Sequence, residues 1–174
     1  MRRRCAALVA TGGLGLIGAL AGCGFHLEGS TPLPPSLAVV HIDTSDTQSD
    51  FYFGLRKALM AAGTRIDDEG RDEASAVIHI LNDSSPLPRT LTVSTLNVPT
   101  EYELTYKISF SVTVNGREVI APEEHSLVRD YSYSENAQLA KERESAILSQ
   151  ALAHDLVSVV MRRLASLSAG AAHS

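Results

Sequence analysis

The residue best placed for covalent chemistry is Cys23, which directly follows the tripeptide LAG. Arginines fill positions 2–4, and an uncharged, mostly apolar run at 6–20 separates them from the cysteine. A charged start, an apolar middle and small residues before a cut are the layout of an export signal. A transmembrane helix is the alternative, but it needs about 20 apolar residues, and this run is shorter and holds four glycines. We therefore expect residues 1–22 to be a cleaved signal peptide.

The same arrangement resembles the lipobox of bacterial lipoproteins. In that class the cysteine thiol takes a diacylglycerol, and the amine freed by the cut is acylated. The resemblance implies that Cys23 carries these chains. Apart from them, we expect no cofactor. The next residue is Gly24. In Gram-negative lipoproteins an aspartate there tends to retain the protein at the inner membrane, so Gly24 resembles an outer-membrane destination with the domain in the periplasm.

Composition limits the remaining functions. Without residues 1–22, 152 of the 174 residues remain, enough for one domain with its own core. Of the 15 basic and 20 acidic residues, the signal holds three basic and no acidic ones, so the remainder has a net charge of −8. Such a domain is a poor general binder of nucleic acid. Cys5 leaves with the signal and Cys23 is acylated, so we expect no disulfide and no catalytic thiol.

The other residues capable of chemistry form no catalytic or metal-binding motif. None of the six histidines has a metal-ligand spacing, and no phosphate-binding loop or nucleophile elbow is present. His41 and His79 lie within apolar strand patterns, which favours structural roles with hydrogen-bonded rings. His154 and Asp155 are adjacent in a predicted helix, so their side chains point about 100° apart. A lipid-anchored hydrolase using these residues or His125 is the least favoured function, and we expect no enzyme.

Basic residues in and beside a predicted hairpin are better candidates for ligand binding. Most cations on a domain surface are simply solvated. A few that converge, however, would bind a phosphate group through charge-assisted hydrogen bonds. The candidates are Arg89, Lys107, Arg129, Lys141 and Arg143.

Hydrophobic patterns predict the elements that position these residues. Apolar, β-branched stretches indicate strands at 37–42 and 75–81. Between them, apolar residues at helical spacing over 51–62, with cap residues before and a glycine after, predict a short helix. Residues 65–73 are expected to form a charged connection. Residues 82–88 contain two prolines and are expected to form a bend or an irregular edge.

The clearest element is a long strand at 102–114. Seven apolar residues occupy every second position of this stretch, with polar residues between them. Strict alternation predicts that one face is buried and the other is wet. Asn115-Gly116 favours a two-residue type I′ turn, so the chain should return antiparallel over 117–133, with a bulge or bend at Pro122.

A broad apolar stripe predicts a last helix at 137–167, about 45 Å long at 1.5 Å per residue. The economical fold is α+β: a mainly antiparallel sheet of about four strands with two helices packed on one face. The expected organisation is a signal peptide at 1–22, a lipid-anchored tether at 23–36, one α+β domain at 37–168 and a flexible tail at 169–174.

Residues 23–27, CGFHL, resemble the mature N-terminus of the LptE family of lipopolysaccharide (LPS) assembly lipoproteins. Further matches follow in the family's order: a proline-containing tether, Glu101-Tyr102 at the start of the long strand, and Leu139-Ala140-Lys141 at the start of the last helix. The resemblance extends over nearly all of the mature chain, to about residue 167.

Membership of this family implies a four-stranded sheet with two helices, seated as a plug in the lumen of the LptD β-barrel. It also implies a role in assembling that barrel and in delivering LPS to the cell surface. Lys141 matches a family lysine implicated in LPS binding, and Arg129 and Lys107 are lesser candidates. Ser94, Thr95 and Asn97 lie in the region where the family has a second basic residue, so that contact is not matched. The alternative is a free-standing periplasmic lipoprotein that binds a small ligand or an envelope polymer.

Overall fold

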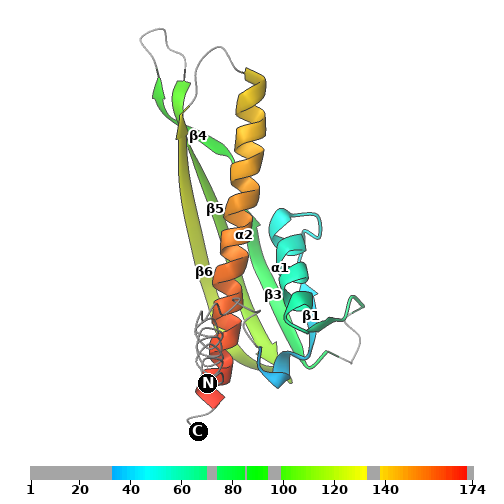
Figure 1. The fold of residues 1–174 in the computed structure, drawn as a ribbon. Coiled ribbons are helices and arrows are strands. Elements are labelled where there is room, and N and C mark those ends of the chain that lie inside the picture. Colours follow the sequence, from blue (N-terminus) through cyan, green and yellow to red (C-terminus); the bar gives the residue numbers. More distant parts are fainter. Residues whose placement is uncertain (1–32, 70–73, 85, 94–98, 133–137, 172–174) are drawn as a thin grey trace, which may run out of the picture.

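The computed structural model describes residues 33–69, 74–84, 86–93, 99–132 and 138–171. Within them the chain is α+β, with two α-helices and six strands in one sheet (Figure 1). The predicted signal peptide, Cys23 and most of the predicted tether lie outside the described residues. In chain order the elements are a 3-10 turn (Pro35–Leu37), β1 (Val39–Asp43), α1 (Asp50–Ala61), β2 (Arg65–Ile66), β3 (Ala76–Ser84), β4 (Pro88–Val93), β5 (Pro99–Val114), β6 (Arg117–Ser132) and α2 (Gln138–Ala171).

The sheet is mixed, and the prediction of about four mainly antiparallel strands matches it only roughly. The strand order is β2-β1-β3-β5-β4, with β6 against the other side of β5. β1 pairs in parallel with β2 and β3, whereas β5 pairs antiparallel with β3, β4 and β6. Residues 65–73, expected to be a connection, contain β2. The segment 82–88, expected to be a bend or an irregular edge, includes the end of β3 and the first residue of β4. The alternation of apolar and polar residues could not reveal β2 or β4, because β2 has only two residues and every residue of β4 is exposed.

Helix α1 forms where its caps and apolar spacing predict it. The Ser49 hydroxyl accepts a hydrogen bond from the backbone N–H of Tyr52 at 3.0 Å, which caps the first turn. Phe51, Leu55 and Leu59 follow one helical face and are fully buried. The helix is followed by Gly63 at a φ of 90°, the left-handed conformation in which glycine avoids a steric penalty.

The long hairpin of β5 and β6 also confirms the sequence pattern. Asn115 and Gly116 have φ angles of 49° and 74°, as a type I′ turn requires. The pairing of β5 with β6 shifts register between Phe110 and Val112, where Pro122 lies on the opposing strand. Six even-numbered residues of β5 face the core and are buried: Tyr102, Leu104, Tyr106, Ile108, Phe110 and Val112. Val114 is partly buried against the core.

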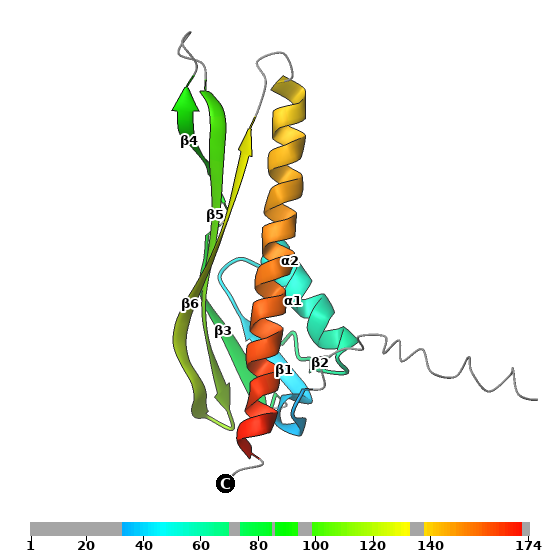
Figure 2. The same ribbon diagram turned by 60° about the vertical axis from the view of Figure 1, so that its left-hand side comes forward.

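Both helices cover the same face of the sheet, as expected (Figure 2). α2 has 34 residues and is about 51 Å long at 1.5 Å per residue. Its buried side chains begin at Leu152 and end at Leu164, and none of its described side chains before Leu152 is buried. The amino-terminal half of α2 therefore extends past α1 and the main core (Figure 1).

A bulge in β3 places a side chain that connects the sheet to helix α1. The register shifts between Ile80 and Asn82, so Asp83 pairs with Ile108 on the inward face. There its carboxylate accepts hydrogen bonds from the Ser49 hydroxyl at 2.5 Å and from the Tyr106 hydroxyl at 2.9 Å. Burial, followed by the bond to Asp83, raises the pKa of Tyr106 well above its usual range. One carboxylate thus joins the α1 cap, β3 and β5.

The Tyr106→Phe variant tests this junction. Loss of the hydroxyl leaves Asp83 with one donor fewer, so we expect the free energy of unfolding at pH 7 to fall by about 1–2 kcal/mol. Because the folded-state pKa of Tyr106 is raised, its contribution is present below the unfolded pKa of about 10 and is lost as pH rises above it. Urea unfolding at pH 7 and pH 10.5 should therefore show a smaller alkaline loss for the variant than for the parent.

Tyr131→Phe is the matched control. Tyr131 is also buried on the inward face, but its hydroxyl has no hydrogen-bond partner among the described residues. Its removal should change the free energy of unfolding by less than about 0.5 kcal/mol. If both variants lose the same free energy of unfolding, the hydrogen bond from Tyr106 to Asp83 contributes no measurable stability.

Candidate functional site

The most distinctive surface is the end of the molecule formed by β4, β5 before Lys107, β6 after Ser126 and α2 before Leu152, which we call the distal end. β3 reaches β5 only as far as Lys107, which pairs with Ser84. Beyond that point β4 takes the place of β3 beside β5. The distal end lies at the top of Figures 1 and 2, away from α1 and β1.

Exposed apolar side chains gather at the distal end. Single exposed apolar residues are normal on any surface, but five of the nine large exposed ones among the described residues lie here or directly before β4. The most exposed are Leu87 at 83% and Ile147 at 66%. The others are Leu91, Val93 and Val128. These residues belong to different faces, since Val128 points outward from the sheet and Ile147 belongs to α2 on the inward side, so together they make the distal end amphiphilic without forming one patch.

Polar groups with a negative balance adjoin these apolar side chains. A cavity of about 300 Å³ is lined by Leu91, Glu101, Asp130, Tyr131 and Ser132. Glu103 lies directly opposite Asp130 across β5 and β6, and Arg89 of β4 is 3.8 Å from Glu103. The distal end therefore presents apolar side chains beside carboxylates.

The three basic residues predicted to contact a ligand do not converge. Lys107 lies on the outward face of β5, with its amine 3.7 Å from Glu124. Arg129 lies on the inward face of β6 and donates to Asp155 of α2 at 3.2 Å. Lys141 is in the first turn of α2, about 21 Å along the helix axis from Asp155, and only its backbone is described. As a ligand contact, each residue stays a prediction.

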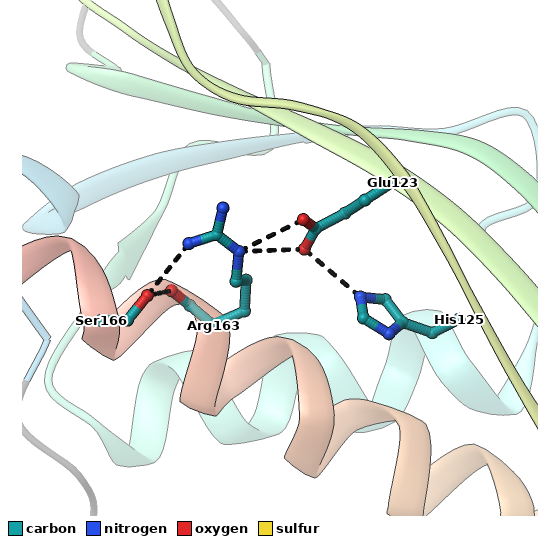
Figure 3. A network of polar contacts seen from close by, with 4 residues as sticks. All are labelled: Glu123, His125, Arg163 and Ser166. Atoms are coloured by element: carbon teal, nitrogen blue, oxygen red, sulfur yellow. Dashed lines mark hydrogen bonds and ion pairs between the residues drawn. The ribbon is translucent and has the colours of Figure 1, made fainter.

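A polar seam joins the inward face of β6 to α2: Glu123, His125 and Arg129 on the strand and Asp155 and Arg163 on the helix. The Arg163 Nε donates to both oxygens of Glu123 at 3.2 Å, and its Nη1 donates to Ser166 at 3.1 Å (Figure 3). His125 lies 3.3 Å from Glu123 and stacks on Phe110. Sequence reasoning did not find this seam, because Glu123 and Arg163 are 40 positions apart and belong to no motif.

The predicted structural roles of the two strand histidines are confirmed at the opposite end of the molecule. His79 of β3 lies between Asp43 of β1 at 2.9 Å and Thr113 of β5 at 3.4 Å. The Nδ1 of His41 is 2.8 Å from the carbonyl oxygen of Asp67. Both rings therefore bridge neighbouring segments of the sheet.

A second cavity, of about 200 Å³, lies beside His41 and contains Tyr52, Asp67 and Asp68 among its lining residues. Arg56 of α1 pairs with Asp68, and this bond lowers the pKa of the Asp68 carboxyl. No group of three or more His, Cys, Asp or Glu side chains in the described part of the chain could hold a metal ion. No helix there combines the length and apolarity that crossing a bilayer requires.

A double-mutant cycle tests the seam. We expect Glu123→Gln and Arg163→Gln to couple by about 1 kcal/mol, because the guanidinium contacts both carboxylate oxygens of a half-buried side chain. The matched cycle is Arg129→Gln with Asp155→Asn, a more exposed pair with one contact, which should couple by about 0.3 kcal/mol. Equal coupling energies in urea unfolding would contradict this ranking.

Comparison with known proteins identifies a matching family and several relatives of this chain. A family model described as lipopolysaccharide-assembly, LptE, matches residues 36–164. The LPS-assembly lipoprotein LptE of Yersinia enterocolitica is 27% identical over 144 residues, which cover 83% of this chain and 69% of the relative. The LPS-assembly lipoprotein LptE of Pectobacterium atrosepticum is 26% identical over 148 residues, covering 85% and 79%.

Solved structures share the architecture. The crystal structure of the rare lipoprotein B from Shewanella oneidensis is 25% identical with a TM-score of 0.65, covering 78% of this chain and 99% of that one. The solution structure of a lipoprotein B from Nitrosomonas europaea is 19% identical with a TM-score of 0.68, covering 82% and 90%.

Proposed function

The chain belongs to the LptE family, and from that premise we propose that it is an outer-membrane lipoprotein of LPS assembly that partners the LptD β-barrel as a plug. The observation that carries the proposal is the family match, which runs from before β1 to the carboxyl-terminal half of α2. The proposed role is non-enzymatic: the protein supports the barrel and helps deliver LPS to the cell surface. Acyl chains on Cys23 would hold it at the periplasmic side of the membrane.

The outward face of the hairpin supports the seating in a barrel. Thr105, Lys107 and Ser109 of β5 point away from the helices, and Ser126 and Glu124 lie beside Lys107 and Ser109 on β6. The lumen of a large outer-membrane barrel is polar. A plug needs a surface of this kind, since an apolar face would leave the groups of the barrel wall without hydrogen-bond partners.

The distal end is the surface that we propose meets LPS, an amphiphile with acyl chains and phosphates. Its exposed apolar side chains suit acyl chains, and Lys141 at the start of α2 suits a phosphate. Arg129 and Lys107 are weaker candidates, because Asp155 and Glu124 already neutralise them. A ligand phosphate would have to displace these carboxylates.

Co-purification from detergent-solubilised outer membrane tests the partnership. We expect LptD to co-purify with the full-length chain in a near-equal molar amount, at a salt concentration that removes loosely bound proteins. A chain recovered without any barrel, yet functional in the envelope, would contradict the proposal and would favour a free-standing lipoprotein that binds a small ligand or polymer.

Charge reversal tests the LPS contact separately. Lys141→Asp should weaken LPS binding to the purified full chain by about tenfold, because a phosphate contact becomes a repulsion. Arg117→Asp is the matched control, since Arg117 lies at the hairpin turn, at the other end of β5 and β6. Equal LPS affinities for the two variants would remove the role of Lys141 and leave the partnership with the barrel untouched.

A further inference from the structure

Strand β6 has an open edge. Within the described residues it pairs only with β5, along its full 16 residues, while its other side has no neighbouring strand. In Figure 1 it runs along the outer side of the hairpin for most of the height of the molecule. An open edge offers unpaired backbone N–H and C=O groups, which are complementary to another extended chain.

The two halves of β6 differ in how well they could accept such a chain. The half nearest the turn has register shifts and Pro122, which are devices that blunt an edge. From Glu123 to Ser132 the pairing with β5 is uninterrupted, from Phe110 opposite Glu123 to Glu101 opposite Ser132. These ten residues form a regular open edge, with neither a bulge nor a proline.

The outward side chains of this segment specify what could lie beside it. They are Glu124, Ser126, Val128, Asp130 and Ser132. Val128 is 51% exposed. Asp130 lies directly opposite Glu103, a like charge that is destabilising at this position; Arg89 is 3.8 Å from Glu103, whereas no described cation pairs with Asp130. A neighbouring strand with a basic residue beside Asp130 would neutralise this carboxylate, and an apolar residue beside Val128 would cover its exposed side chain.

A second copy of this chain fits poorly. Side chains directly opposite one another on paired strands lie on the same face of a sheet. Two β6 edges would therefore set the outward residues of one copy against those of the other. This set holds no cation and two carboxylates: Glu124, which is 3.7 Å from Lys107 of β5, and Asp130, which has no described cation partner. The observations favour a foreign strand of basic character over self-association.

We propose that Glu123–Ser132 of β6 is a docking edge to which a partner protein adds an extended basic segment by main-chain hydrogen bonds. The added strand would lie about 4.8 Å from β6, with a lysine or arginine at Asp130 and an apolar side chain at Val128. This contact does not depend on seating in a barrel or on LPS binding.

A peptide tests the proposal. The probe is a ten-residue peptide that alternates valine and threonine and carries two lysines on one face, added to the full chain in detergent. We expect saturable binding by fluorescence anisotropy, and slower hydrogen exchange at alternate amides of Glu123–Ser132. The same peptide with N-methyl groups on the amides that would face β6 should bind at least tenfold more weakly, because it cannot form the main-chain hydrogen bonds to this strand.

A charge swap tests the specificity. Asp130→Lys should weaken binding of the lysine peptide at least tenfold, and a matching glutamate peptide should recover it. The variant should fold, because it turns the repulsion with Glu103 into an attraction; its thermal unfolding checks this. The proposal is overturned if the lysine peptide does not bind, if the N-methylated peptide binds equally well, if protection falls outside β6, or if the swap has no effect.

Discussion

The long hairpin of β5 and β6 determines how the other elements are arranged, because each of its strands has 16 residues, whereas β3 has nine and β4 has six. One face of β5 is buried from Tyr102 to Val112, so something must cover that face along its whole length. α1, β1 and β3 cover or extend only the half nearest the turn, and α2 spans the rest. The molecule therefore has an end packed by α1, β1 and β3, and a distal end where α2 faces the hairpin and β4 without any buried side chain among its described residues before Leu152. Asp83 marks the boundary, since its carboxylate joins the α1 cap to β3 and β5.

This division bears on the proposed role. The packed end resembles an ordinary domain core, with histidines and carboxylates that bridge neighbouring segments of the sheet. At the distal end apolar side chains remain exposed beside carboxylates. Closer to the hairpin turn, α2 is held to β6 through the polar seam as well as through apolar contacts. Polar outward strands and an amphiphilic end suit a protein that is seated among other polar walls and meets a lipid with charged groups.

Much of this fold follows from local rules that the sequence displays. The alternation of β5, the Asn115-Gly116 turn and the Ser49 cap each have one strongly preferred structure, and each was predictable. β2 was not, since two residues carry no alternation, and the exposed β4 alternates too imperfectly to be identified as a strand. The bulge in β3 was also hidden, because two prolines near Asp83 favoured a bend. Lys107 and Arg129 belong to opposite faces of one hairpin, and only the register of the two strands reveals this.

The most direct test of the central claim is the accessibility of the outward sheet face in the membrane. Thr105 lies on that face of β5, and Thr105→Cys would introduce a single thiol, since Cys23 is expected to be acylated. We expect a small maleimide to label this thiol readily in the purified protein, at least tenfold more slowly in outer membranes that contain LptD, and readily again in membranes depleted of LptD. Equally rapid labelling in all three preparations would contradict the seating of this chain inside the barrel.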